Sequence, residues 1–286
     1  MRGFNTVVVI GSGDIACKCI KILADHHDNV VCIEHEKGYL SMMKSICQKY
    51  NCRYKAITEQ EQLLEYFNKI TVKTLIVSAN NNYIFPEAVL DKQNLSVINF
   101  HNALLPHHGG RNAPTWAIFQ MDETTGITWH EVTPKVDAGD IIIQRGIVIA
   151  QDMTALELAR KCMEVGAEAF QEIIPKLLAE NYTARVQLPA KEMGFHYSGD
   201  IPNAGIMDIS WSTERISAFL RSLDYGKIRI LPRPRVVLLD KCYVIERYHI
   251  IRTGKQDLAR VIVNKYRAFI CSQGLSITLY LKGWGE

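Results

Sequence analysis

The stretch Ile98-Asn99-Phe100-His101 holds the residue types best suited to chemistry. Asn99 and His101 lie two positions apart at the end of an apolar run. In a β-strand this spacing places both side chains on one face. A side-chain amide next to an imidazole can stabilise an oxyanion and act as a general base. The structural interpretation also stays open: Asn99 would end the strand and His101 would bond the following loop.

Two carboxylates surround a glycine further along the chain, in Val136-Asp137-Ala138-Gly139-Asp140. A carboxylate next to a histidine raises the basicity of the imidazole and holds its tautomer. A hairpin turn favours Asp and Gly for backbone reasons alone. This segment by itself therefore fits either a catalytic or a structural interpretation.

A glycine turn near the N-terminus reads Gly11-Ser12-Gly13-Asp14-Ile15-Ala16. It is similar to a shortened G-x-G-x-x-A dinucleotide pattern, in which backbone amides at a helix N-terminus meet an anion. Glu34 ends the next apolar run, where an NAD-binding unit has its acidic residue. An NAD-dependent oxidoreductase is one hypothesis, and a plain turn is the other.

The elements that must position these residues alternate between strand and helix. Apolar runs predict strands over 6–11, 30–34, 74–78 and 96–100, and helical spacing predicts helices over 15–23, 39–50 and 59–67, with a short one after Pro86. Such alternation predicts an α/β, mostly parallel sheet covered on both faces. Ligands bind at the carboxyl ends of the strands in such sheets, where Asn99 and His101 fall.

The second half of the chain differs from the first half in composition and in its expected elements. A Gly- and Pro-rich loop over 102–114 precedes a helix over 115–121, strands over 126–132 and 141–149, and a long helix over 155–180. We expect a catalytic domain over 1–185, a linker over 186–204, and a small C-terminal OB-like β domain over 205–286, with one helix and five short strands.

Composition excludes several classes of protein. The chain has 286 residues, which suits about two domains. Its 48% hydrophobic and 22% charged residues are typical of a globular protein, and no apolar run is long enough for a membrane helix. The net charge of +3 is too weak to indicate nucleic-acid binding. Eight cysteines without a C-x-x-C pair or a signal peptide predict reduced thiols and a cytoplasmic location.

Five motifs then occur in one order along the chain: Asn99-x-His101, Leu104-Leu105-Pro106, Gly109-Gly110-Arg111-Asn112, Gly126-Ile127-Thr128-Trp129-His130 and Asp137-Ala138-Gly139-Asp140. Together they resemble the 10-formyltetrahydrofolate-dependent formyltransferases. That family includes methionyl-tRNA, aminosugar and peptide-synthetase-associated members. The resemblance implies a Rossmann-like N-formyltransferase domain that takes its one-carbon unit from 10-formyltetrahydrofolate and uses no metal.

The resemblance also implies roles for individual residues. Asn99 and His101 would stabilise the tetrahedral oxyanion, and His101 with Asp137 would manage the proton of the acceptor amine. The folate donor would contact Asn80, Asn82, Tyr83, Ile84, Val136, Ala138, Gly139 and Asp140. The acceptor would contact Gly13, Asp14, Arg111 and His130.

The acceptor itself stays open in the sequence. We expect the amine of a small or carrier-linked acceptor, either an aminosugar nucleotide or an amino-acid derivative. A carrier-protein-bound substrate is one of the partners that this leaves open. Methionyl-tRNA is the alternative acceptor. It is disfavoured because the net charge of the chain is near neutral and because we expect no dense basic run in the second domain. An NAD-dependent oxidoreductase would give Asn99, His101 and Asp137 no joint task. A folate-binding domain without turnover is a third hypothesis.

Overall fold

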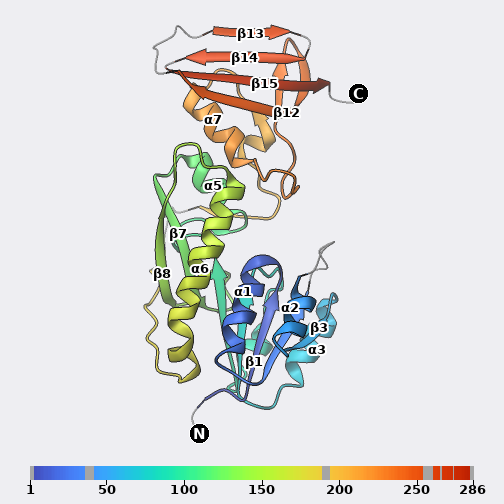
Figure 1. Cartoon of the computed structure of the whole chain (residues 1–286), viewed down its shortest axis with the longest axis vertical. Helices are drawn as coiled ribbons and strands as arrows, with labels where there is room; N and C mark the ends of the chain where they lie inside the picture. Colours follow the sequence, from blue (N-terminus) through green and yellow to red (C-terminus); the bar gives the residue numbers. More distant parts are fainter. Residues whose placement is uncertain are drawn as a thin grey trace. The chain divides into compact units, whose positions relative to one another are not determined.

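The computed structural model describes residues 3–35, 42–188, 194–253, 260–264, 266–272 and 274–283. The chain forms two compact units (Figure 1). The first comprises residues 1–110, 126–147 and 160–195, and the second comprises 111–125, 148–159 and 196–286. The division into domains at a linker over 186–204 stays a prediction, and residues 189–193 of that segment lie outside the described residues.

A seven-stranded sheet forms the centre of the first unit, in the order β3-β2-β1-β4-β5-β7-β8. Neighbouring strands from β3 to β5 are parallel, and β7 is antiparallel to β5. This arrangement confirms the predicted α/β class with a mostly parallel sheet. The strands are β1 (Thr6–Gly11), β2 (Val30–Glu34), β3 (Arg53–Ala56), β4 (Thr74–Ala79), β5 (Leu95–His101), β7 (Thr124–Glu131) and β8 (Ile141–Val148). The sequence analysis missed β3, because its four residues form no apolar run and are mostly exposed at the sheet edge.

Helices cover both faces of this sheet. They are α1 (Gly13–Ala24), α2 (Met43–Lys49), α3 (Gln60–Asn68), α4 (Glu87–Leu90) and α6 (Ala155–Leu178). On one face, Val8 and Ile10 of β1 pack in one buried cluster with Leu63 and Phe67 of α3. The helix expected over 39–50 is described from residue 42 onward, where α2 forms.

The opposite face of the sheet packs against α6. Gly166 lies so close to β5 that an added Cβ would come 2.2 Å from the ring of Phe100. Trp129 of β7 donates from Nε1 to the Gly166 carbonyl at 2.9 Å. Because side chains alternate along a strand, Phe100 on this face puts Asn99 and His101 on the other.

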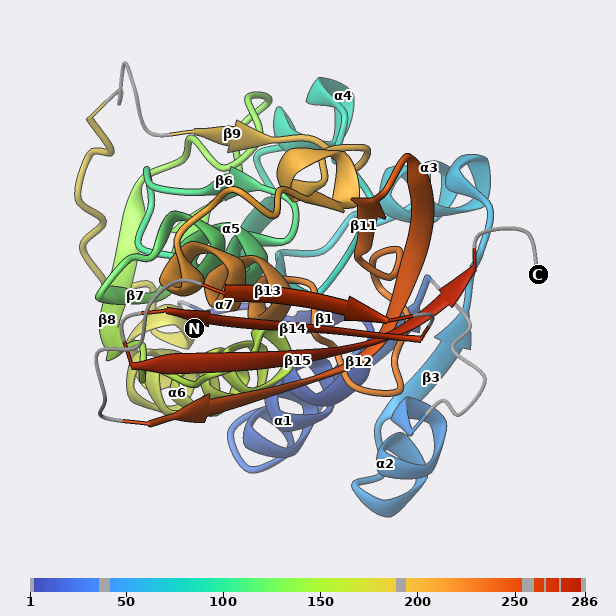
Figure 2. The same ribbon diagram turned by 90° about the horizontal axis from the view of Figure 1, so that it is seen from above.

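The second unit is a small β domain with helices. Its six-stranded sheet has the order β10-β11-β12-β15-β14-β13, and Figure 2 shows β12 to β15 side by side. Ile216 and Phe219 of α7 form its core with inward side chains such as Ile277 of β15. The elements are α5 (Ala113–Gln120), η1 (Pro202–Gly205), β10 (Ile206–Met207), α7 (Thr213–Ser222), β11 (Arg235–Leu238), β12 (Lys241–Arg252), β13 (Arg260–Asn264), β14 (Arg267–Ser272) and β15 (Leu275–Gly283).

Two further short strands are β6 (Gly109–Gly110) and β9 (Phe195–His196). Within the residues that the structure describes, no helix is long and apolar enough to cross a membrane.

Candidate active site

The register between β5 and β7 gathers polar side chains at the carboxyl end of β5. Asn99 pairs with His130, Phe100 with Trp129, and His101 with Thr128. Directly paired residues point to the same face of a sheet. Asn99, His101 and His130 therefore share the face opposite the apolar contact with α6.

The loop that follows β7 brings Asp137 to the same place. Its Oδ2 lies 3.5 Å from His101 Nδ1, and its Oδ1 lies 3.5 Å from His130 Nε2. The backbone amide of Gly110 donates to Oδ2 at 2.7 Å. The side chains of His101, His130 and Asp137 are 7%, 2% and 9% exposed, so the charge of Asp137 is only weakly screened by solvent.

Backbone carbonyls fix which ring nitrogen of each histidine carries the proton. His101 Nε2 lies 2.8 Å from the carbonyl of His108, and a carbonyl only accepts, so Nε2 is the protonated nitrogen. In the neutral ring, Nδ1 is then basic and faces Asp137. His130 Nδ1 lies 2.7 Å from the Glu131 carbonyl, so its Nε2 accepts from Asn99 Nδ2 at 3.2 Å.

This geometry differs in one respect from the expectation for the carboxylate. The tautomer of His101 is held by the backbone carbonyl of His108, not by Asp137. Asp137 instead faces the nitrogen that takes up a proton, so it stabilises the imidazolium that would form there.

The pKa shifts of His101 and Asp137 place an uncharged imidazole beside an ionised carboxylate. Burial lowers the pKa of His101, and the nearby charge of Asp137 opposes that shift without cancelling it. Burial raises the pKa of Asp137, but His101, His130 and the Gly110 amide outweigh it and lower that pKa to about 2. At neutral pH the site therefore holds an ionised carboxylate and an uncharged imidazole.

A hydrogen-bonded chain from the neighbouring strand orients the amide of Asn99. Ser78 of β4 donates from Oγ to Asn99 Oδ1 at 2.7 Å, and Asn81 donates from Nδ2 to Ser78 Oγ at 3.3 Å. Because Oδ1 is occupied, Nδ2 is the end of Asn99 that faces the site. Ser78 was not among the predicted site residues, although it ends the predicted strand that precedes β5 and so lies at the same edge of the sheet.

Thr128 and Gln144, which were not among the predicted site residues, hold the loop that follows His101 by hydrogen bonds. Thr128 Oγ1 donates to the Ala103 carbonyl at 2.6 Å and accepts from the Leu105 amide at 3.0 Å. Gln144 Nε2 donates to the Leu105 carbonyl at 2.8 Å and to Thr128 Oγ1 at 2.9 Å. Thr128 was recognisable as the β7 partner of His101, whereas nothing in the local sequence indicated Gln144.

The residues expected to contact folate lie on two loops of the first unit. Asn80, Asn82, Tyr83 and Ile84 follow β4, and Val136, Ala138, Gly139 and Asp140 flank Asp137 between β7 and β8. Ile84 and Val136 expose 68% and 41% of their surface, while Tyr83 is buried among aromatic rings. Gly139 is sterically required, because an added Cβ would lie 1.8 Å from the Glu131 carbonyl oxygen.

Of the residues expected to contact the acceptor, His130 lies in the buried group, and acceptor contact by the others stays a prediction. Gly13 and Asp14 open α1, where Asp14 pairs with Lys18 at 2.8 Å. Arg111 is exposed in the second unit, and its backbone amide donates to the His196 carbonyl at 2.8 Å.

Neighbouring protein groups contact the glycine turn before α1. Asn80 Nδ2 donates to the carbonyl of Ser12 at 3.3 Å, and an added Cβ on Gly11 would lie 1.9 Å from the Ala79 carbonyl oxygen. Glu34, expected to meet a ribose in an NAD site, is buried and accepts from Tyr54 Oη at 2.6 Å. This turn therefore serves to pack β1 against the loop after β4.

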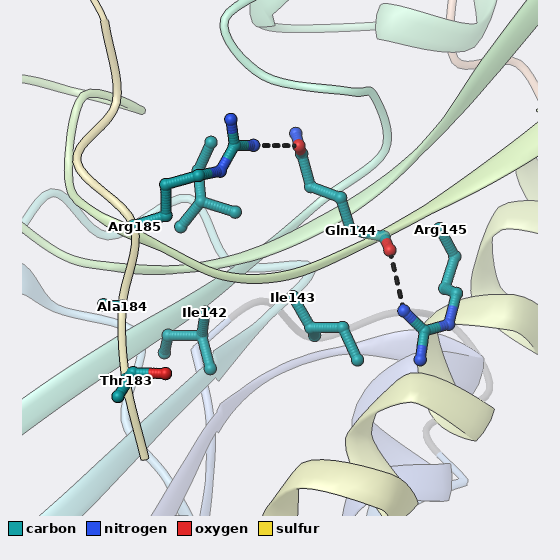
Figure 3. A pocket seen from close by; sticks show the side chains of 8 residues that line it. Ile142, Ile143, Gln144, Arg145, Thr183, Ala184 and Arg185 are labelled. Carbon is teal, nitrogen blue, oxygen red and sulfur yellow. Dashed lines mark hydrogen bonds between the residues drawn. The ribbon is translucent and has the colours of Figure 1, made fainter.

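A separate surface pocket of about 380 Å³ lies between the start of β8 and residues 183–185 (Figure 3). Within it Arg185 donates from Nη2 to Gln144 Oε1 at 2.9 Å. None of Asn99, His101 or Asp137 lines this pocket. Among the described residues, no group of three or more His, Cys, Asp or Glu side chains is placed to hold a metal ion.

The fold and this site define a Rossmann-like α/β protein with a buried Asn-His-Asp group at the carboxyl end of a central strand. Residues 4–174 match the model of the formyl transferase family. The chain therefore belongs to the formyl transferase family, whose members are enzymes that transfer formyl groups, and the predicted family is confirmed.

Sequence relatives and solved structures of the same fold include enzymes with different acceptors. A methionyl-tRNA formyltransferase of Clostridioides difficile is 26% identical over 76% of this chain and 73% of its own length. A GDP-perosamine N-formyltransferase of Brucella melitensis is 26% identical over 63% of this chain and 66% of its own. An N-formyltransferase of Helicobacter canadensis, solved with folinic acid and dTDP-3-aminofucose, superposes with a TM-score of 0.76 at 15% identity, covering 97% of this chain and 99% of its own.

Proposed function

We propose that this chain transfers a formyl group from 10-formyltetrahydrofolate to the primary amine of a small or carrier-linked acceptor. The observation that carries the proposal is the buried pair in which His101 Nδ1, the basic nitrogen, faces the ionised Asp137. A proton acceptor next to a fixed anion suits the removal of a proton from an attacking amine.

Each residue of the group has one task in this reaction. The amine nitrogen attacks the formyl carbon, a C–N bond forms, and the bond from that carbon to N10 of the donor breaks. Asn99 Nδ2, held toward the site by Ser78, stabilises the oxygen of the tetrahedral intermediate. His101 Nδ1 takes the proton from the attacking amine and delivers it to the departing N10, so charge and protons balance. Asp137 stabilises the imidazolium between these two steps.

The loops beside this group suit a flat aromatic donor. Ile84 and Val136, on the two loops expected to contact folate, expose apolar surface that can pack against a heterocycle. Support comes from the Helicobacter canadensis structure with folinic acid, and from HypX of Aquifex aeolicus, solved with tetrahydrofolic acid, which has a TM-score of 0.67 at 13% identity over 98% of this chain. HypX is much longer, and this chain covers 44% of it.

An aminosugar nucleotide is the small acceptor that the relatives favour. The Brucella melitensis relative acts on GDP-perosamine, and the Helicobacter canadensis structure holds dTDP-3-aminofucose. An amino-acid derivative on a carrier protein rests only on the resemblance of residues 112–117 and 128–130 to peptide-synthetase-associated members.

Methionyl-tRNA is the second candidate acceptor, and two observations favour it. Several relatives are methionyl-tRNA formyltransferases. The expectation that the second domain lacks a dense basic run is also wrong, because Lys227, Arg229, Arg233 and Arg235 stand within nine residues that contain no acidic residue. The relatives therefore give no support to excluding nucleic acid.

A panel of acceptors tests the proposal. The protein is incubated with 10-formyltetrahydrofolate and an aminosugar nucleotide, a free amino acid derivative or methionyl-tRNA. Release of tetrahydrofolate and gain of one formyl group by mass are measured. We expect transfer to the aminosugar nucleotide, and loss of transfer in the His101→Ala variant. A His101→Ala protein with full turnover would contradict the proposed mechanism.

A further inference from the structure

The segment that follows α6 runs as an extended strap over residues 182–188, beyond the part of the chain that matches the family model. Two backbone hydrogen bonds of 2.8 Å join Arg185 to Ile141 at the start of β8. Tyr182 Oη donates to Glu131 Oε1 at 2.8 Å, and the Arg185 guanidinium reaches Gln144 (Figure 3). These contacts hold residues 182–185 of the strap against β7 and β8, directly before Gln187.

Gln187 of this strap reaches the loop that carries Asp137. Its Nε2 donates to the Asp137 carbonyl at 2.7 Å and to the Gly139 carbonyl at 3.2 Å. Asp137 has a φ of +53°, a left-handed conformation that costs a non-glycine residue energy and persists only when its surroundings impose it. One amide group thus holds together two carbonyls of a loop with an unfavourable backbone conformation.

Packing alone does not explain why a glutamine occupies position 187, as the oxygen of its side-chain amide shows. Its Oε1 is buried and has no hydrogen-bond partner among the described residues. A buried acceptor without a partner costs free energy that a hydrocarbon side chain of similar size would avoid. The feature of Gln187 that offsets this cost is its donor end, which bonds the Asp137 loop.

We propose that Gln187 is a positioning residue for formyl transfer, acting through Asp137. By fixing the loop over 137–139, it holds the Asp137 carboxylate 3.5 Å from His101 Nδ1. This inference rests on the proposed function. Without the two bonds, the loop relaxes, the carboxylate moves away from the imidazole, and His101 loses the charge that opposes the lowering of its pKa.

The Gln187→Leu variant tests this role, with Gln93→Leu, at an exposed glutamine before β5, as the matched control. A displacement of about 1 Å in a catalytic group can cost about 10²-fold in rate. We expect kcat of Gln187→Leu to fall by about tenfold to 50-fold, no further than in Asp137→Asn, with the acid limb of the pH profile moved to lower pH. The midpoint of urea unfolding should stay close to that of the wild type, because the unpartnered Oε1 is removed as well.

A double variant separates positioning from a purely structural role. If Gln187 acts through Asp137, then adding Gln187→Leu to Asp137→Asn costs little further rate. The inference is overturned if turnover of Gln187→Leu stays within about twofold of the wild type. It is also overturned if the rate losses of Gln187→Leu and Asp137→Asn multiply in the double variant and the pH profile of Gln187→Leu does not shift. Should the leucine variant fail to fold, Gln187→Asn, one methylene shorter, is judged by the same criteria.

The same assays distinguish failure of this inference from failure of the proposed function. If His101→Ala retains full formyl transfer, the proposed function fails and Gln187 has no catalytic pair to position. If His101→Ala is inactive while Gln187→Leu behaves as Gln93→Leu does, only the positioning role is overturned.

Discussion

The Asp137→Asn variant removes one charge from the site and keeps nearly the same shape. In the wild type, Asp137 Oδ2 lies 3.5 Å from His101 Nδ1. Two unit charges at that distance interact by about 5 kcal/mol at an effective dielectric constant of about 20. If about half of the imidazolium charge has developed in the transition state, the loss is about 2.4 kcal/mol, or about 50-fold in rate.

The pH dependence of this variant has a definite sign. Asp137 raises the pKa of His101 against the larger lowering by burial. Removing the anion lowers the pKa of His101 further, and the neutral imidazole is the active form of the base. The acid limb of kcat/KM therefore moves to lower pH in Asp137→Asn. Initial rates of tetrahydrofolate release between pH 4 and pH 9 would show the shift.

A double variant shows whether Asp137 acts through His101. In the His101→Ala background no imidazolium forms, so adding Asp137→Asn should cost less than about threefold in turnover. If the two losses multiply, or if the acid limb of Asp137→Asn stays in place, the assigned pairing is wrong. Asp137 would then serve to fold its loop or to bind the acceptor.

Three further outcomes are expected. Asn99→Ala should lower turnover by about 10²–10³-fold, as for loss of an oxyanion donor, while the Kd of tetrahydrofolate in calorimetry changes little; unchanged turnover would remove Asn99 from the mechanism. Gly139→Ala should lower the midpoint of urea unfolding, since its Cβ would lie 1.8 Å from the Glu131 carbonyl oxygen, and an unchanged midpoint would contradict the rigidity of this loop. Calorimetry should detect no NAD binding, because Glu34, which would meet the ribose, is buried and accepts from Tyr54 Oη; micromolar affinity would revive the oxidoreductase hypothesis.

The α/β class of the fold and the strand that carries the candidate site residues could be predicted from the sequence. Apolar runs that alternate with helical spacing define the strands and helices of the first unit, since each run reports burial along its own segment. The two-residue spacing of Asn99 and His101 fixed their common face, because side-chain alternation is a property of the strand backbone. The exposed strand β3 was missed, because it forms no apolar run.

How the candidate site is assembled could not be predicted from the sequence, because it depends on contacts between distant segments. The His108 carbonyl sets the tautomer of His101, Ser78 turns the amide of Asn99, and Gln187 reaches the Asp137 loop from beyond α6. Each of these contacts joins segments that no local pattern relates. A sequence period reports which face of one element is buried, whereas the partner of a particular polar atom depends on how separate elements pack and how the loops between them close.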